Sequence, residues 1–141
     1  MVPSGTAPAG ACVFCDIVAH RAPAHVIFED PHAIAFLDIF PFTRGHLLVV
    51  PKHHGARLTD LSTDERAGLI HALHEVIRRV DRITEDYNVA LNAGARAGQV
   101  VFHVHFHVIP RYGEANPFHP RAREPLDGAE AKRLVAELSS P

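Results

Sequence analysis

Short runs of β-branched, aromatic and other apolar residues, separated by turn residues, predict a set of strands in this chain. One run is continuously apolar up to Pro51, which indicates a strand covered on both faces. Asp30 and Pro31 mark a turn between two other runs. The runs are residues 24–30, 32–38, 45–51 and 87–93.

Three segments carry helical patterns. Residues 12–19 have apolar positions spaced for a short helix, with Phe14, Ile17 and Val18 turned inward. Ser62 and Glu65 form a capping box ahead of a long helix, and Asp127 opens a last, short one. These elements predict an α+β domain with a mainly antiparallel sheet. The apolar stripe of the long helix comprises Leu69, Leu73, Val76, Val80 and Ile83.

The segment VVFHVHFHVIP, residues 100–110, places His103, His105 and His107 at every second position of an apolar run. On a strand these three side chains share one face, about 6.6–6.8 Å apart along the backbone, and could hold one small anionic group between them. The alternate residues would then pack on a core and make the strand a rigid platform. These residues are Val100, Phe102, Val104, Phe106 and Val108.

Two chemical uses of the three histidines compete. Imidazoles at this spacing can bind a catalytic metal, or one ring can act as a nucleophile while the others orient it, bind charge or move protons. The preceding loop favours the second use, because Asn92 and Gln99 offer amide donors to phosphate oxygens. Gly94 and Gly98 in the same loop allow the backbone to approach an anion closely.

Composition narrows the function further. Apolar residues make up 47% of the chain and charged residues 21%, which is typical of a globular protein. The formal net charge is −2 and no Lys/Arg-rich run occurs, so we expect no nucleic-acid partner. No apolar stretch approaches the roughly 18–20 residues that a membrane-spanning helix needs, so we expect no membrane partner. Residues 1–10 lack the basic and apolar regions of a secretory signal, and we interpret them as the flexible leader of a cytoplasmic protein.

The two cysteines, Cys12 and Cys15, form a C-x-x-C pair. In a protein expected to reside in the reducing cytosol, such a pair suggests metal or redox chemistry rather than a structural disulfide.

The histidine segment HVHFHVIPR, with LNAGARAGQ before it, resembles the signature of the histidine triad (HIT) family of nucleotide hydrolases and transferases. FCDIVA, FEDPHAIAFLDIFPFTRGHLLVVPKHH and the helix after LTDLSTDE follow in the order of the family, so the resemblance covers about residues 12–111. It is similar to the Hint-like branch with an N-terminal C-x-x-C. The resemblance implies a five-stranded antiparallel sheet with flanking helices, and two subunits that pair into a ten-stranded sheet.

This resemblance also predicts the domain organisation of the chain. It implies a single HIT domain over residues 11–141, with a core at 12–111 and a C-terminal tail at 112–141 that sets leaving-group preference.

By the same resemblance His105 is a nucleophile that attacks the α-phosphorus of a purine nucleotide derivative. A nucleotidyl-histidine forms, and water releases the nucleoside monophosphate; the substrate would be a nucleoside phosphoramidate or a dinucleoside polyphosphate. His107, His103 and His46, the last being the fourth histidine of the family's active site, would be catalytic residues beside it. The remaining phosphate contacts would come from Asn92, Gln99 and the backbone N–H of Val100.

The nucleoside is expected near the N-terminal half. Asp38 matches the acid that accepts hydrogen bonds from both ribose hydroxyls, and the apolar base slot matches Phe14, Ile17, Phe36 and Ile39. One departure concerns Val100, where phosphoramidate-cleaving relatives often carry Ser or Thr. The missing hydroxyl weakens the case for amine leaving groups.

The resemblance gives the cysteines a role as well. Some relatives complete a structural zinc site with two histidines, one after the third strand and one that is the first of the triad. The first of these corresponds here to His54, with His53 as the adjacent alternative, and the second corresponds to His103. The metal ligands would be Cys12, Cys15, His54 and His103, and the chemistry itself would need no metal.

Two alternative functions stay open: a metal-dependent hydrolase that uses the histidine strand as ligands, and a non-catalytic nucleotide-binding dimer with a regulatory role.

Overall fold

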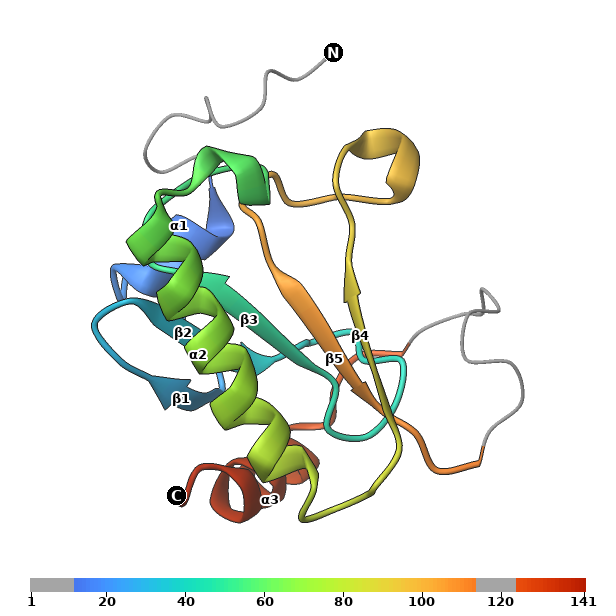
Figure 1. The fold of residues 1–141 in the computed structure, drawn as a ribbon. Coiled ribbons are helices and arrows are strands. Elements are labelled where there is room, and N and C mark those ends of the chain that lie inside the picture. Colours follow the sequence, from blue (N-terminus) through green and yellow to red (C-terminus); the bar gives the residue numbers. More distant parts are fainter. Residues whose placement is uncertain (1–11, 114–123) are drawn as a thin grey trace.

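The computed structural model describes residues 12–113 and 124–141, which form a five-stranded antiparallel sheet with helices packed against it (Figure 1). This confirms the predicted α+β class, with one long helix and short helices near the two ends. The expected leader at residues 1–10 lies outside the described residues. The strands are β1 (Val26–Glu29), β2 (Ala33–Leu37), β3 (Leu47–Pro51), β4 (Tyr87–Leu91) and β5 (Phe106–Pro110), in the spatial order β1-β2-β3-β5-β4. The helices are α1 (Val13–Val18), α2 (Thr63–Val80) and α3 (Gly128–Leu138), with short 3₁₀ turns η1 (Leu58–Asp60) and η2 (Ala95–Ala97).

Helix α2 begins where its sequence predicted. Ser62 Oγ accepts from the Glu65 N–H at 3.1 Å, and the Glu65 carboxylate accepts from the Ser62 N–H at 2.7 Å, which completes the capping box. The apolar stripe faces the sheet, although Ile83 lies past the end of the helix and packs against the same core. Within the described chain, no helix is long and apolar enough to cross a membrane.

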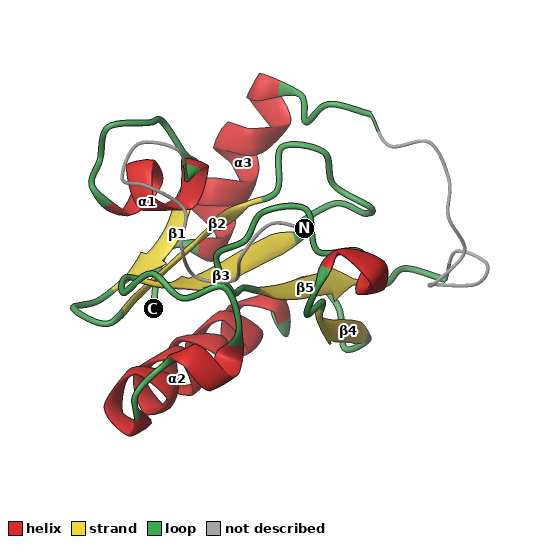
Figure 2. Ribbon diagram, turned by 90° about the horizontal axis from the view of Figure 1, so that it is seen from above, coloured by secondary structure: helices red, strands yellow, loops and turns green. Residues whose placement is uncertain are grey.

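Two apolar layers cover opposite faces of the sheet. Ala35 and Val49 pack with α2 on one face, whereas Ile34 and Val50 pack with α1 on the other (Figure 2). All five residues of β3 are buried, which confirms the prediction of a strand covered on both sides. The candidate site described below lies on the α1 face.

The histidine segment is a strand only from Phe106 onward, so the predicted strand begins too early. The pairings of β5 with β3 and with β4 both end at Phe106. Before it, the Val104 N–H donates to the Gly55 carbonyl at 2.7 Å, which draws the chain toward the segment after β3.

The predicted apolar face of this segment is correct only in part. Val104 and Val108 are buried in the core beneath α2, with Phe106 packed against it. Val100 is 85% exposed, so the expectation that it packs on the core is wrong. The reason is its position before the strand, where the alternation of faces no longer applies.

Candidate active site

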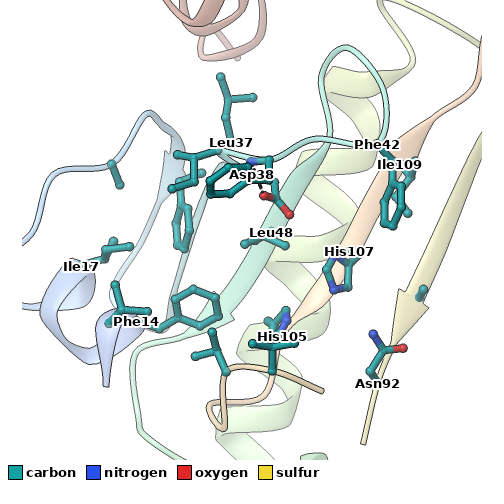
Figure 3. Close-up of a pocket in the computed structure, with 18 of the residues that line it drawn as sticks. Phe14, Ile17, Leu37, Asp38, Phe42, Leu48, Asn92, His105, His107 and Ile109 are labelled. Carbon is teal, nitrogen blue, oxygen red and sulfur yellow. Dashed lines mark hydrogen bonds between the residues drawn. The ribbon is translucent and has the colours of Figure 1, made fainter. Parts of the chain in front are cut away.

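A cavity of about 810 Å³ opens on the α1 face of the sheet, between α1, the β2–β3 loop (residues 38–46) and the strands β4 and β5 (Figure 3). Most of its wall is apolar, and the polar side chains of the described lining are Asp38, Asn92, His105 and His107. The lining contains no Lys or Arg among the described residues. Sequence reasoning missed several apolar members, because nothing in their local pattern separates them from core residues: Val13, Leu48, Phe42, Ala90, Val101 and Ile109.

The ring of His105 has a defined tautomer. Its Nδ1 lies 2.8 Å from the backbone carbonyl oxygen of His103, and because a carbonyl only accepts, Nδ1 carries the proton. Nε2 therefore keeps its lone pair. The ring is 7% exposed and lies edge-on to Phe14, with centroids 5.0 Å apart at 88°. Burial lowers the pKa of His105, because the imidazolium would lose its hydration, while the bond to His103 and the charge of Asp38 oppose this shift.

His107 and His46 form a directed hydrogen-bond pair. The Phe42 N–H donates to His46 Nδ1 at 3.0 Å, so the proton of neutral His46 lies on Nε2. That Nε2 is 2.9 Å from His107 Nδ1, which therefore accepts and leaves the proton of neutral His107 on its own Nε2. The Phe42 ring stacks on His46 at 5.5 Å and 17°. His46 is 1% exposed and does not itself line the cavity.

Asp38 lies at the end of β2, on the wall of the cavity. Its Oδ1 accepts from the Phe40 N–H at 2.8 Å, which fixes the carboxylate at the start of the loop. Its Oδ2 lies 3.6 Å from His46 Nε2. The apolar residues predicted for a base slot, Phe14, Ile17, Phe36 and Ile39, all line the same cavity.

The loop before the histidine segment places some of its predicted phosphate-binding residues at the cavity and others outside it. Asn92 and Val100 line the cavity, whereas Gln99 is 4% exposed and lies outside the lining. The Gln99 amide donates to the Ala56 and Val101 carbonyls at 2.8 and 3.1 Å and accepts from the Gly94 N–H at 2.8 Å. These bonds use both of its N–H groups, so Gln99 shapes the loop and is not positioned to bind phosphate as predicted.

His103 points away from the other two histidines, into a group with Cys12, Cys15 and His54. Its Nε2 donates to the Pro51 carbonyl at 2.8 Å, so its Nδ1 carries the lone pair. This Nδ1 lies 3.5 Å from each cysteine sulfur and 3.2 Å from His54 Nδ1. His54 Nδ1 is in turn 3.2 Å from the Cys15 sulfur.

These four donor atoms fit a tetrahedral zinc ion. With Zn–N about 2.0–2.1 Å and Zn–S about 2.3 Å, the N–N and N–S edges of such a tetrahedron are about 3.3–3.6 Å, close to the N–N and N–S spacings of 3.2–3.5 Å found here. His54 Nε2 is buried without a hydrogen-bond partner, so the ring offers its Nδ1 inward. Burial lowers the pKa of His103 to about 4 and, together with neighbouring Cys12, raises the pKa of the Cys15 thiol to about 11. His53 instead pairs with Glu65 at 3.1 Å, so His54 is the histidine of this group.

A second group, Asp38, His46 and His107, also brings its ligand atoms within 4.8 Å of one another. A metal there would need a lone pair on His46 Nε2, and the Phe42 N–H holds the proton on that atom. The group therefore suits a hydrogen-bonded relay better than an ion. Within the described residues His105 belongs to neither metal-like group, which speaks against the three strand histidines acting as one ligand set.

The sequence of the chain is similar to a known protein family and to several known proteins. The HIT domain family matches residues 19–114. An uncharacterized HIT-like protein of Methanocaldococcus jannaschii is 45% identical over 102 residues, which cover 72% of this chain and 79% of that protein. The adenosine 5′-monophosphoramidase hnt1 of Schizosaccharomyces pombe is 38% identical over 135 residues, covering 92% of this chain and 96% of that protein.

Among solved structures, the crystal structure of a Zn-bound histidine triad family protein from Mycobacterium smegmatis superposes with a TM-score of 0.79 at 39% identity. The match covers 94% of this chain and 96% of that one.

Proposed function

The chain belongs to the HIT domain family, and we propose that it is a nucleotide hydrolase or transferase that acts at the α-phosphate of a purine nucleotide derivative through a covalent nucleotidyl-His105. The observation that carries this proposal is the tautomer of His105. Its proton is held on Nδ1 by the His103 carbonyl, so the Nε2 lone pair is available for attack. The monophosphoramidase relative from S. pombe adds support from similarity.

Two displacements complete the reaction. In the first, Nε2 of His105 forms a bond to phosphorus while the bond from phosphorus to the leaving group breaks, and the leaving atom takes the bonding pair. His107 is placed to donate a proton from Nε2 to that atom, supported by the hydrogen bond from His46 to its Nδ1. In the second, water attacks phosphorus and gives a proton back to Nε2 of His107. The bond from phosphorus to Nε2 of His105 breaks, its electron pair returns to the imidazole, and the monophosphate is released. His103, which we expected among the catalytic groups, acts here through its carbonyl as a positioning residue.

The cavity lining suits an uncharged leaving group better than a polyphosphate. We assign the ribose hydroxyls to Asp38 and the base to the slot formed by Phe14, Ile17, Phe36 and Ile39. A polyphosphate leaving group would find no Lys or Arg in the described lining to balance its charge. An uncharged amine would need none, so we favour nucleoside phosphoramidates over dinucleoside polyphosphates.

We assign structural zinc to Cys12, Cys15, His54 and His103, on the fit of their donor atoms. The ion would supply crosslinking and positive charge to two thiolates, and no step of the reaction passes through it. These residues join α1, the segment after β3 and the histidine segment.

We further propose a homodimer that pairs through β4. This strand ends the sheet, with β5 as its one neighbour in the described chain, and Val89 on it is 40% exposed. An edge strand of this kind can pair with a second copy. Light scattering at micromolar concentration tests this assignment, and a monomeric mass would contradict it.

Trapping the intermediate tests the central proposal. The protein is incubated with adenosine 5′-phosphoramidate, quenched in base and digested, and the adenylylated peptide is located by mass spectrometry. We expect the adduct on His105 and none in His105→Ala. An adduct on His103 or His107 instead would overturn the role of His105.

The same samples distinguish the proposed function from the two alternatives, a metal-dependent hydrolase and a regulatory nucleotide-binding dimer. Reversible loss of turnover on chelation, with an unchanged unfolding temperature and no adduct, would favour a metal-dependent hydrolase. Binding of adenosine monophosphate without adduct or turnover would favour a regulatory nucleotide-binding dimer.

A further inference from the structure

The β2–β3 loop supplies Asp38, Ile39, Phe40 and Phe42 to the cavity wall, but the contacts that hold this loop come from outside the cavity. Three of them come from α3 and the residues just before it, more than eighty positions later in the sequence. The Thr43 hydroxyl also donates to the Pro110 carbonyl at 2.6 Å, at the end of β5. Figure 1 shows α3 at the opposite end of the sheet from η1 and η2.

Arg44 forms the principal connection. Its Nε donates to Glu130 Oε1 at 2.6 Å, and its Nη2 donates to Glu137 Oε2 at 2.9 Å. Glu130 and Glu137 are seven residues apart on α3 and therefore lie on one face of the helix, two turns from each other. One guanidinium thus bridges both carboxylates, a use that its planar fork of donors permits.

Further bonds reinforce this connection. The Leu126 N–H, just before α3, donates to the Ile39 carbonyl at 2.8 Å. The Tyr112 hydroxyl donates to the Arg44 carbonyl at 2.6 Å. The β2–β3 loop is therefore held at both its beginning and its end.

Helix α3 is itself firmly seated. Ala131, Leu134 and Leu138 are fully buried in the core that α2 and the sheet share. Arg82, just past α2, donates to the Ser140 carbonyl and holds the chain after α3. A helix anchored in this way can serve as a fixed support for the loop.

We propose that Arg44 is a positioning residue for the nucleotide pocket, and that α3 acts through it to hold Asp38, Ile39 and Phe40 where a nucleoside would contact them. This inference rests on the proposed function, since it assumes that the pocket binds a nucleotide. It gives the C-terminal helix a role in binding the nucleoside, in addition to any effect of the tail on the leaving group.

The expected consequence is weaker nucleoside binding with little change in the chemical step. Asp38, Ile39 and Phe40 supply ground-state contacts, whereas the chemical step belongs to His105 and to the His107–His46 pair. His46 ends the same loop, but it is 1% exposed and its bonds to Phe42 and Asp38 do not involve Arg44. The two ion pairs are partly exposed, with the Arg44 side chain at 41%, so their loss should have a moderate effect.

The test compares four variants by calorimetric titration with adenosine monophosphate and by steady-state kinetics with adenosine 5′-phosphoramidate. Arg44→Ala and the double variant Glu130→Gln/Glu137→Gln should each raise Kd and KM about three- to tenfold and change kcat less than about twofold. Combining them should add little, because both remove the same contact. Arg133→Ala is the matched control, since Arg133 pairs with Glu130 within α3 and forms no ion pair with the loop among the described residues.

A ligand-free measurement accompanies the titration. The Phe40 amide donates to Asp38, so its hydrogen exchange reports the geometry of that carboxylate. We expect faster exchange at Phe40 in Arg44→Ala and wild-type exchange in Arg133→Ala. Unchanged Phe40 exchange and unchanged Kd in Arg44→Ala, or equal effects in Arg133→Ala, would overturn the proposal. If the wild type binds no adenosine monophosphate, the proposed function fails, and Phe40 exchange alone decides whether Arg44 positions the loop.

Discussion

The backbone carbonyl of His103 accepts a hydrogen bond of 2.8 Å from Nδ1 of His105. The ring of His103 meanwhile faces Cys12, Cys15 and His54. One residue therefore belongs to the metal-like group by its side chain and fixes the tautomer of its neighbour by its backbone. Replacing the His103 side chain leaves the carbonyl in the chain but removes the contacts of the ring with Pro51 and His54.

The His46–His107 pair predicts a specific kinetic defect. In His46→Ala, His107 loses the donor at 2.9 Å from its Nδ1, so it protonates the leaving group less effectively. We expect kcat for adenosine 5′-phosphoramidate to fall roughly 10- to 100-fold, as for other residues that orient a catalytic group. The Kd for adenosine monophosphate should stay within about twofold, because His46 does not line the cavity. His53→Ala, at an exposed histidine, is the control, and equal kcat in His46→Ala and wild type would refute the relay.

The cysteine pair predicts a loss of metal and of stability. Purified wild type should carry about one zinc per chain, and Cys12→Ser/Cys15→Ser should carry none, because two of four ligands are gone. For a loss of about 3 kcal/mol the unfolding temperature of a domain of this size falls by roughly 6–12 °C. Elemental analysis and calorimetry on the same samples measure both quantities. A wild type purified without any metal that unfolds at the same temperature as the double variant would contradict the zinc assignment.

Val100 offers a gain-of-function test. Its side chain is 85% exposed at the cavity, so Val100→Ser should fold normally and place a hydroxyl beside the substrate. We expect kcat/KM for a nucleoside phosphoramidate to rise about fivefold, the effect of one hydrogen bond of about 1 kcal/mol. Val100→Ala controls for the loss of the larger side chain. No gain in the serine variant over the alanine variant would show that the hydroxyl is not needed here.

The apolar base slot predicts weak discrimination between bases. Phe14, Ile17, Phe36 and Ile39 carry no polar side-chain group that could recognise the edge of a base. We expect adenosine and guanosine phosphoramidates to differ in kcat/KM by less than about tenfold, since apolar contacts distinguish substrates only modestly. Competition between the two in one reaction measures the ratio directly, and a preference of a hundredfold or more would require a polar contact from elsewhere.

Glu29 predicts a pH dependence of stability. Its carboxylate accepts from Lys52 at 2.7 Å, and this bond lowers the pKa of Glu29 despite partial burial. A lowered folded-state pKa means that the contribution to stability is present above the unfolded pKa and is lost as the pH falls through the folded value. The difference in unfolding free energy between wild type and Glu29→Gln should therefore shrink between pH 6 and pH 3. Urea unfolding at several pH values checks this, and a constant difference would exclude the ion pair as its source.

Local patterns were sufficient to predict most of the elements. The Ser62–Glu65 capping box and the continuous apolar run before Pro51 each depend on neighbours in sequence, and both were correct. The start of β5 was not predictable in this way. It depends on where the partner strands stop pairing and on the bond between Val104 and Gly55, which lie far apart along the chain.

The candidate site shows the same division. The spacing of the histidines and the C-x-x-C pair indicated which residues carry chemistry, and similarity to the HIT family predicted a metal group separate from the catalytic group. The role of the Phe42 N–H in fixing the His46 tautomer was missed, because a backbone donor leaves no signal in a side-chain pattern. Gln99 was assigned to phosphate because its amide suits that task, but the loop itself uses that amide.

Phe14 lies between Cys12 and Cys15 in sequence, and its ring contacts both His103 and His105. One turn of α1 is therefore shared by the proposed ion and the proposed nucleoside. Thermodynamic reciprocity then requires that any tightening of nucleotide affinity by the ion be matched by an equal tightening of ion affinity by the nucleotide. In a cell short of the metal, the protein would lose the part of its nucleotide affinity that the ion supplies.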